Sequence, residues 1–301
     1  MLNPINEHTA VMRFSALGDI AGTIPTLRAL SVKPTIITTA IGKELLKDEY
    51  ENFIILKDKK IFSILSLILR IRKEKFKILL DFQCNDRSRF ISKFSNAKVF
   101  NNHLLDTNHS TNIFFDIAKQ ANIVQSLDIT FIPKEKSYIV LNCGSSPKWV
   151  SKRLPFEKWH QISTLLYERY HLPFLLTGDT LEKEYIEEVA QYIVGTKEVV
   201  AGKTTIQELK KILKDAFLTV STDSAPMHIA AVQKTPTIGL FGPTNWIRSA
   251  PYGPWSVALY DTLFYADNIP PKRSILEQNN YFNHIDITSA LDKLSPYLGS
   301  S

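Results

Sequence analysis

The chain alternates short apolar segments with longer segments of helical periodicity, and this alternation limits the possible folds more than any other feature. In the first half, runs rich in β-branched residues predict strands, and apolar residues spaced three or four apart predict helices. The predicted strands begin in TAVMRFSALGD, PTIITTA and FKILLDF, and the predicted helices cover IAGTIPTLRAL and IFSILSLILRI. Strands and helices in this order are typical of parallel sheets with helices on both faces. We therefore expect an α/β fold.

The second half of the chain repeats this plan. Its predicted strands lie in SYIVLNCG, LPFLLTG, KDAFLTV and TPTIGLFG, and its predicted helices in PFEKWHQISTLLYERY, LEKEYIEEVAQYIV, IQELKKILKDA and PMHIAAV. The polar, proline-containing segment FIPKEKS (131–137) separates the halves and predicts two domains, 1–134 and 135–301. Two facing Rossmann-like domains with mostly parallel sheets would leave an interdomain cleft at their carboxyl edges, where ligands of such sheets bind.

A polar turn lies between the last two predicted strands, in STDSAPMHIAAV. Asp223 and Ser224 are favoured N-cap residues and Pro226 suits a first helical turn, so we expect a short helix to begin here. Free N–H groups at such a helix start attract anions such as phosphate. The candidate ligand-binding residues of this turn are Asp223, Ser224, Ala225 and His228. For His228, a place in the core is an equally good interpretation.

A second candidate is the cationic loop GSSPKWVSKRLPFEKWH, which follows the first strand of the second half. Lys152 and Arg153 are either solvated loop charges or the cations of a diphosphate site, with Ser145 and Ser146 as hydrogen-bond donors. The chain has no Asp-x-Asp pair to hold Mg²⁺ or Mn²⁺ against a diphosphate. Protein groups would then have to neutralise any phosphate.

Two carboxylates lie at predicted helix starts. Asp19, in SALGDIAGTIP, is either an N-cap or a general base that takes a proton from a substrate hydroxyl. Glu182, in TGDTLEKEYIEEV, either complements the helix dipole or holds a ribose diol by paired hydrogen bonds.

Several other classes of protein are disfavoured by the sequence. There is no G-x-G-x-x-G and no Walker A loop, which argues against dehydrogenases and P-loop enzymes. Cys84 and Cys143 stand alone, which argues against a disulfide framework or a zinc site and favours a reducing cytosol. The net charge of +6 fits anionic ligands, anionic lipid or simply solubility. Nucleic-acid binding would require clustered basic and aromatic residues, which we do not find.

The most apolar run, IFSILSLILRI (61–71), is shorter than the about 20 residues that a membrane span needs. Because RKEKFK follows it, this run is either a basic amphipathic helix on an anionic membrane or a core helix, and we favour the core helix. The start MLNPINEHTA lacks the basic and apolar regions of a secretory signal, so we expect a cytoplasmic protein.

Three segments carry a resemblance to a known family. TDSAPMHIAAVQKTPTIGLFGPTN resembles the D-[ST]-G-x-x-H-x-x-A-A signature, ending in F-G-P-T, of glycosyltransferase family 9, the bacterial ADP-heptose:lipopolysaccharide heptosyltransferases. RFSALGDIAGTIPTLRAL is similar to the family's opening R-x-S-x-x-G-D-x-x-x-x-x-P-x-L-x-x-L, and SKRLPFEKW resembles its K-x-W-P segment. The three motifs follow the family's order from residue 13 to 245, over nearly the whole chain.

The resemblance implies a GT-B fold, with the acceptor bound by the first domain and the donor by the second. By motif, Asp19 matches the proposed catalytic base, Lys152 the phosphate-binding lysine and Glu182 the ribose-binding carboxylate. Asp223 and His228 match the donor-site turn. Such enzymes need no metal or cofactor and invert the anomeric centre. The last segment, ITSALDKLSPYL, is a candidate to pack back on the first domain.

The implied donor is ADP-heptose, and the implied acceptor is the lipopolysaccharide inner core at the cytoplasmic face of the inner membrane, to which the protein would be peripheral. Nucleic acid is not an implied partner. Two alternatives remain open: a related transferase with another nucleotide-sugar donor, and a catalytically silent nucleotide-sugar-binding protein.

Two residues depart from the family pattern. Ala225 stands where the family usually has Gly, so the backbone approach to the donor should be tighter. Leu154 replaces the Trp of K-x-W-P, which affects how that loop packs. Neither departure removes a charged group.

Overall fold

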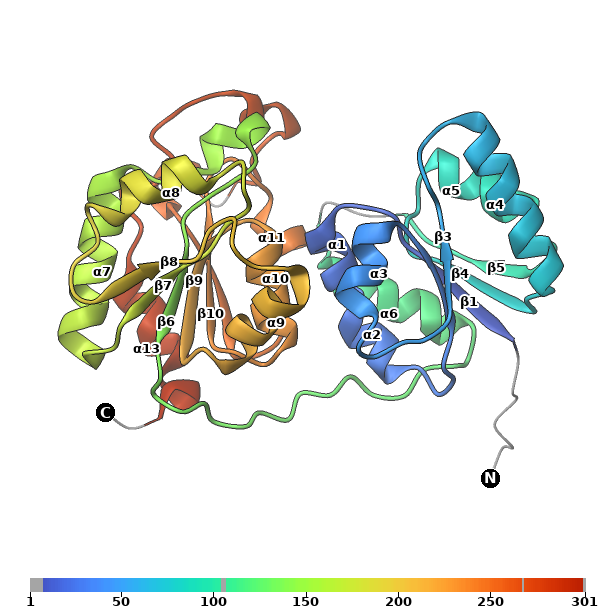
Figure 1. Cartoon of the computed structure of the whole chain (residues 1–301), viewed down its shortest axis with the longest axis horizontal. Helices are drawn as coiled ribbons and strands as arrows, with labels where there is room; N and C mark the ends of the chain where they lie inside the picture. Colours follow the sequence, from blue (N-terminus) through green and yellow to red (C-terminus); the bar gives the residue numbers. More distant parts are fainter. Residues whose placement is uncertain (1–7, 104–106, 267, 300–301) are drawn as a thin grey trace. The chain divides into compact units, whose positions relative to one another are not determined.

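The computed structural model describes residues 8–103, 107–266 and 268–299. The chain divides into two compact units, with the division between Asp128 and Ile129. Each unit is a parallel sheet with helices on both of its faces (Figure 1). The α/β fold with parallel sheets that the sequence predicts is therefore confirmed.

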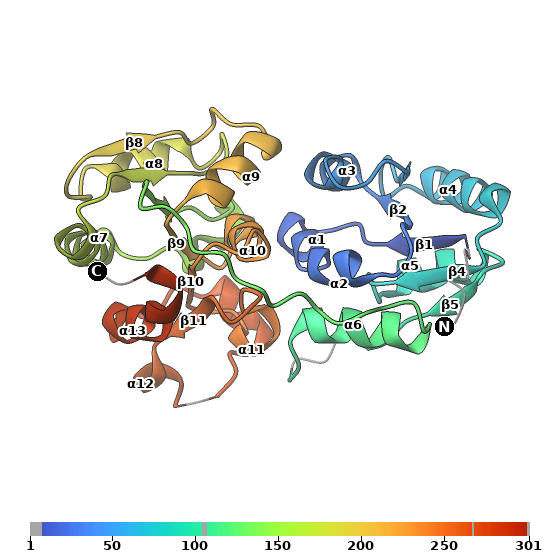
Figure 2. The same ribbon diagram turned by 90° about the horizontal axis from the view of Figure 1, so that it is seen from below.

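The first unit contains a five-stranded sheet of order β3-β2-β1-β4-β5. The strands are β1 (Thr9–Met12), β2 (Thr35–Thr38), β3 (Phe53–Ile55), β4 (Ile78–Asp81) and β5 (Lys98–Phe100). The helices are α1 (Leu17–Ala21), α2 (Ile24–Ala29), α3 (Ala40–Leu46), α4 (Ile61–Glu74), α5 (Asp86–Lys93) and α6 (Ser110–Gln120). Helices α1, α2, α3 and α6 lie on one face of the sheet, and α4 and α5 lie on the other (Figures 1 and 2).

The segment 20–30, predicted as one helix, forms parts of the two short helices α1 and α2. Pro25 lies in the first turn of α2, where a missing N–H does no harm. Further inside a helix the same proline would remove a hydrogen bond, so the chain starts a new helix here.

The second unit contains a six-stranded sheet of order β11-β10-β9-β6-β7-β8. The strands are β6 (Ile139–Asn142), β7 (Phe174–Leu176), β8 (Lys197–Val199), β9 (Leu218–Thr222), β10 (Thr237–Phe241) and β11 (Ser256–Tyr260). The α-helices are α7 (Phe156–Tyr170), α8 (Lys183–Ala190), α9 (Ile206–Asp215), α10 (Ala225–Val232), α11 (Trp246–Ser249), α12 (Thr262–Tyr265) and α13 (Ile287–Leu298). Two 3₁₀ helices, η1 (Pro147–Lys152) and η2 (Lys272–Leu276), complete the unit.

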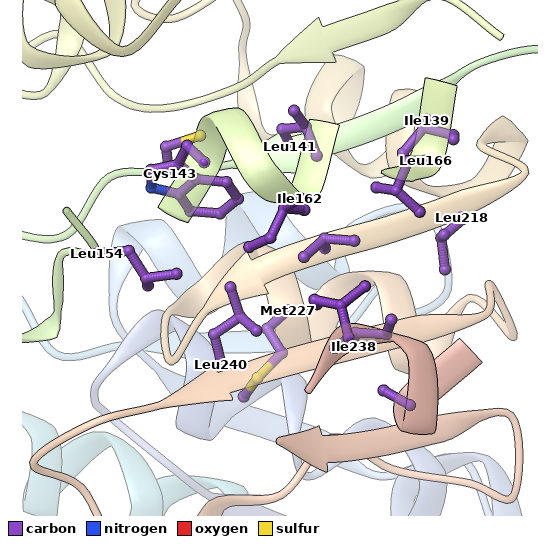
Figure 3. Packing of buried hydrophobic residues seen from close by; sticks show 14 of the residues in the cluster. Ile139, Leu141, Cys143, Leu154, Ile162, Leu166, Leu218, Met227, Ile238 and Leu240 are labelled. Atoms are coloured by element: carbon purple, nitrogen blue, oxygen red, sulfur yellow. The ribbon is translucent and has the colours of Figure 1, made fainter. Parts of the chain in front are cut away.

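The core of the second unit fills the space between the sheet and the helices α7, α8 and α13. Figure 3 shows strand residues such as Leu141 and Ile238 near Ile162 and Leu166 of α7. All four side chains are at most 3% exposed. Because strands of a sheet covered on both faces are buried on both sides, they appear in the sequence as continuous apolar runs.

The final helix, α13, belongs to this core. Its residues Leu291 and Leu294 are fully buried, and the helix contacts β11. The apolar face of α13 is therefore used within the second unit, and packing of this helix on the first domain stays a prediction.

The segment that joins the units has no regular secondary structure from residue 125 to 135. Phe131 packs on Trp255 and Tyr297, and the Lys134 ammonium donates to the carbonyl of Lys214 (2.8 Å). These contacts attach residues 129–134 to the second unit, whereas the sequence-based boundary assigned them to the first.

Within the described parts of the chain, no helix is both long and apolar enough to cross a membrane. Cys84 and Cys143 are both free thiols, and Cys143 is buried. The described residues contain no group of three or more His, Cys, Asp or Glu side chains placed to hold a metal ion.

Candidate active site

In the second unit, the candidate residues gather where the strand order reverses. Strand β6 pairs with β7 on one side and with β9 on the other, so the loops that follow β6 and β9 diverge at their shared carboxyl edge. Such a switch point is where parallel α/β sheets bind ligands. The loop after β6 carries η1, and the loop after β9 leads directly into α10.

Lys152 and Asp223 meet at this switch point, although 71 positions separate them. The Lys152 ammonium donates to the Asp223 carboxylate (3.0 Å) and to its backbone carbonyl (2.9 Å). The two side chains are 15% and 9% exposed. A cation is thus fixed beside the first residues of α10.

The Asp223 carboxyl is ionised despite its burial. Burial alone raises its pKa, but the positive charge of Lys152 and then the nearby His228 outweigh burial, so the pKa lies below its ordinary value. The pair therefore persists in mildly acidic solution.

The N-terminus of α10 is formed as the sequence predicts, with Ser224 as the extended N-cap residue and Pro226 in the first turn. The Ser224 hydroxyl makes no capping hydrogen bond to the helix. It instead accepts from the amide of Asn142 (2.9 Å) and donates to the carbonyl of Thr222 (3.2 Å). No side chain of the N-cap residue therefore occupies the helix start, which can bind an anion. Ala225 and His228 lie on this helix and are partly exposed.

Glu182 lies beside the same loops, at the N-cap position of α8. Its carboxylate accepts from the backbone N–H of Asp179 (2.9 Å), and the residue is only 9% exposed. Burial raises the pKa of Glu182, although the hydrogen bond from Asp179 acts in the opposite direction. Two glycines make room for it: a Cβ atom on Gly144 would lie 2.8 Å from the Glu182 Cδ, and one on Gly178 would lie 3.1 Å from its Oε2.

Arg153 is held between the loop after β6 and helix α8. It donates to the carbonyl of Ser145 (2.9 Å), and its guanidinium stacks 4.1 Å from the ring centre of Tyr185. Its buried Nε has no hydrogen-bond partner among the described residues. Arg153 is therefore an ordered cation with one donor still unused, not a solvated loop charge.

The two predicted serines differ in their surroundings. Ser145 is buried, and its hydroxyl donates to the carbonyl of Trp149 (2.8 Å), so it stabilises η1. Ser146 is exposed, and its backbone carbonyl accepts from the Trp149 N–H (2.7 Å) at the start of the same helix. Of the two, Ser146 is the one whose hydroxyl remains accessible to a ligand.

Asn142 is a site residue that the sequence analysis missed. It ends β6, is 1% exposed, and donates to Ser221 and Ser224 while it accepts from Thr177 (3.2 Å). These bonds fix the loops after β6, β7 and β9 to one another. The signal was present in the sequence, since an amide at the end of the apolar run SYIVLN must find partners when buried.

In the first unit, Asp19 lies at the third position of α1, just after β1, with a side chain that is 43% exposed. Its Oδ2 accepts from the backbone N–H of Ala16 (2.7 Å), and its Oδ1 pairs with Arg13 (2.9 Å). The N-cap interpretation of Asp19 is wrong, because Ala16 occupies that position. Asp19 instead bonds back to the N-cap backbone and keeps part of its carboxylate open to a substrate.

Arg13 positions this carboxylate. The arginine side chain is 5% exposed, donates to the carbonyl of Phe82 (2.6 Å), and lies 5.4 Å from the ring centre of Phe114. Arg13 opens the RFSALGD motif, but the sequence alone does not indicate its role. Because its other contacts are buried, Arg13 presents a fixed charge to Asp19.

A pocket of about 200 Å³ lies at the carboxyl edge of the first sheet. Its lining includes Ser15 from the turn that precedes Asp19, Gln83 after β4, and the basic residues Lys57, Lys59 and Arg87. A larger pocket of about 430 Å³ in the second unit borders Arg153 but does not include Lys152, Glu182 or Asp223. We therefore place the second unit's site by its charged groups and not by pocket size.

The two departures from the family pattern can now be located. Leu154 is 2% exposed in the core of the second unit (Figure 3), and its carbonyl accepts from the Tyr185 hydroxyl (3.3 Å). The loop is thus packed without the usual Trp. Ala225 is the first residue of α10, so its methyl group lies at the helix start beside Lys152 and Asp223.

Comparison with known proteins identifies relatives of this chain. The family model of glycosyltransferase family 9 (heptosyltransferase) matches residues 39–263. The lipopolysaccharide core heptosyltransferase OpsX of Haemophilus influenzae is 24% identical over 283 residues, with 80% of this chain and 81% of OpsX covered. Lipopolysaccharide heptosyltransferase 1 of Campylobacter coli is 25% identical over 295 residues, with 80% and 85% covered.

Solved structures show the same fold. A family 9 glycosyltransferase from Veillonella parvula superposes with a TM-score of 0.73 at 16% identity, covering 97% of this chain and 98% of that one. The heptosyltransferase WaaC of E. coli with ADP gives 0.67 at 15% identity, covering 82% and 91%. The GT-B class predicted for the two Rossmann-like units is confirmed.

Proposed function

Because the chain belongs to glycosyltransferase family 9, we propose that it transfers a heptose from ADP-heptose to the inner core of a lipopolysaccharide, without a metal ion and with inversion of the anomeric centre. In this proposal the second unit binds the donor and the first unit binds the acceptor. The protein would work as a peripheral enzyme at the cytoplasmic face of the inner membrane.

The observation that carries the donor assignment is the Lys152–Asp223 pair at the start of α10. A fixed lysine and a helix N-terminus without a side-chain cap both favour a diphosphate, and the helix contributes about 0.3–2 kcal/mol. Glu182, on the next loop along the sheet, has the carboxylate expected to bind a ribose diol. The relative OpsX is a lipopolysaccharide core heptosyltransferase, and the structure of WaaC contains ADP, both of which agree with a heptose transferred from an ADP sugar.

The reaction would be one in-line displacement. Asp19 accepts the proton of the acceptor hydroxyl as that oxygen attacks the anomeric carbon of the donor. The bond from that carbon to the diphosphate breaks, and its electron pair leaves with ADP. Lys152, Arg153 and the N–H groups of α10 then stabilise the charge that develops on the departing phosphate.

The basic pocket in the first unit supports binding of an anionic acceptor there. Lys57, Lys59 and Arg87 line it next to the turn that leads to Asp19. Lys and Arg side chains bind carboxylate and phosphate groups by charge-assisted hydrogen bonds, so an acidic or phosphorylated acceptor would fit this pocket.

Titration calorimetry with ADP, GDP and UDP in buffer that contains EDTA tests the donor assignment. Selective ADP binding, followed by heptose transfer from ADP-heptose to a truncated lipopolysaccharide, would support the proposal. Preference for GDP or UDP would overturn the ADP-heptose donor. Failure to bind any of the three would point to a protein that does not use these nucleotides.

A further inference from the structure

Helix α4 has two apolar faces, and only one of them is used inside the first unit. Ile64, Leu67, Ile68 and Ile71 are buried against the sheet, as expected for a core helix. A second stripe faces solvent: Ile61, Phe62, Leu65 and Leu69 are 55%, 81%, 45% and 68% exposed. Three of these recur every four residues and the fourth neighbours the first, so they share one side of the helix.

This stripe, which we call the α4 apolar stripe (Ile61, Phe62, Leu65 and Leu69), is surrounded by basic residues. Between positions 57 and 77 the chain has eight Lys and Arg and only two acidic residues. This excess equals the formal net charge of +6 of the whole chain. All eight basic residues are exposed: Lys57, Lys59, Lys60, Arg70, Arg72, Lys73, Lys75 and Lys77.

Helix α5 lies next to α4 on the same face of the sheet (Figure 1). It adds two aromatic side chains to this side of the unit, since Phe90 and Phe94 are 43% and 41% exposed and their rings contact each other. Exposed aromatic and aliphatic residues among lysines and arginines are characteristic of helices that lie in a membrane interface.

We propose that the α4 apolar stripe and its basic residues dock the first unit on an anionic lipid bilayer. The apolar side chains enter the boundary between headgroups and acyl chains, while Arg72, Lys73 and their neighbours bind lipid phosphates. A second copy of the chain is a poorer partner, because a symmetric contact would bring two strongly basic surfaces together.

Docking at this surface would also bring the acceptor pocket close to the bilayer. Lys57 and Lys59, which line that pocket, belong to the loop that leads directly into α4. A membrane-embedded acceptor would then meet the pocket without leaving the bilayer. The purpose of docking rests on the proposed function, whereas the docking itself is measured without any sugar nucleotide.

Co-sedimentation of the full chain with vesicles tests this inference. We expect binding to vesicles of phosphatidylglycerol and phosphatidylcholine, and much weaker binding to phosphatidylcholine alone. Phe62→Ser with Leu69→Ser should reduce the partition coefficient by at least about tenfold. Arg72→Gln with Lys73→Gln should reduce it by about fivefold per charge removed, and only for anionic vesicles.

Leu263→Ser is the matched control, because Leu263 is 73% exposed but lies on α12 of the second unit. This variant should bind vesicles like the wild type, and the thermal midpoints of all variants should agree. Failure of the wild type to bind anionic vesicles, or equal binding by the stripe variant, would overturn the inference. Dissociation of a wild-type dimer by the stripe substitutions, without vesicle binding, would overturn it in favour of a contact between copies.

A transfer assay separates this inference from the proposed function. The stripe variant should transfer normally to a deacylated acceptor and poorly to the same acceptor embedded in vesicles. If the wild type transfers heptose to neither acceptor, the proposed function is contradicted. The vesicle-binding result would still hold, because it is measured without any sugar nucleotide.

Discussion

Asp19 carries the proton-transfer step of the proposed reaction, and its setting allows a clean test. Because general-base assistance contributes about 10² to 10⁴ in rate, Asp19→Asn should lower kcat by that factor. The variant keeps an oxygen that can accept from Ala16, so the turn should persist. ADP affinity, measured by calorimetry, should not change, because the nucleotide belongs to the other unit in our proposal. Normal turnover would remove Asp19 from the mechanism.

Lys152 should matter for donor binding more than the other lysine of the same 3₁₀ helix. Lys152→Ala should weaken ADP binding about 10- to 100-fold, the usual range for a charge-assisted hydrogen bond. Lys148→Ala is the matched control, since Lys148 is exposed on η1 and should leave the affinity unchanged.

Removal of Lys152 also leaves the buried Asp223 carboxylate unpaired. The double variant Lys152→Ala with Asp223→Asn removes that buried charge, so it should recover stability in thermal unfolding relative to Lys152→Ala. It should not recover ADP affinity. Recovery of both would mean that Lys152 acts only as a structural partner of Asp223.

The raised pKa of Glu182 predicts that the free energy of unfolding depends on pH. Its pKa in the folded protein is raised by burial, so the folded state binds more protons than the unfolded state between the ordinary and the raised value. Its contribution to the free energy of unfolding is therefore lost as pH rises through that interval. Chemical unfolding of the wild type and of Glu182→Gln should show the wild type losing stability relative to the variant as pH rises above about 4.5. Parallel curves would contradict the shift.

At the residue scale, the candidate residues could be predicted from the sequence, but their partners could not. Asp19, Lys152 and Asp223 could be recognised as candidates from the sequence, but the Arg13–Asp19 and Lys152–Asp223 pairs could not be predicted from it. Both contacts depend on the strand order of the sheets and on loop conformations, which no local pattern encodes. The role of Asn142 could not be predicted for the same reason, since its partners Ser221 and Thr177 lie on β9 and just after β7.

At the scale of elements, most of the strongly periodic segments were predicted, whereas helix α6 and several short elements were not. Strands β3, β5 and β8 each have three residues, which is too short for a clear strand pattern, and β5 and β8 also begin with exposed lysines. Neighbouring strands supply the hydrogen bonds that make them strands. Helix α4, by contrast, was correctly predicted as a core helix. Its second apolar face could be recognised only from the exposed fractions of its side chains in the structure.

The glycine at position 144, in the loop after β6, leaves room for the Glu182 carboxylate. The Cβ atom of Gly144→Ala would lie 2.8 Å from the Glu182 Cδ, so the carboxylate must move. We expect weaker ADP binding with only a small loss in the free energy of unfolding, because the displaced atoms are the end of a flexible side chain. Gly22→Ala in the first unit is the control, because its new Cβ would meet no atom nearer than 3.5 Å. Unchanged ADP affinity in Gly144→Ala would show that the position of Glu182 is unimportant.

At the scale of the whole molecule, the two compact units should respond to ligands separately. Each has its own sheet and its own buried core, and residues 125–135 between them form no regular structure. ADP at a hundred times its Kd should stabilise the second unit by about 2.7 kcal/mol. Hydrogen exchange followed by mass spectrometry should show new protection in the loops after β6, β7 and β9. Protection confined to the first unit would show that the nucleotide binds there, which would contradict our assignment of the donor to the second unit.

The Lys152–Asp223 pair should also affect which of the small anions in a cell can bind at this site. Because Lys152 is already paired with Asp223, any anion that binds this lysine must compete with a buried carboxylate, and a free phosphate has fewer groups with which to do so than a nucleotide. A nucleotide that also engages Glu182, Arg153 and the start of α10 can meet that competition with several contacts at once. In our proposal, the pair would therefore favour a complete nucleotide over a free phosphate.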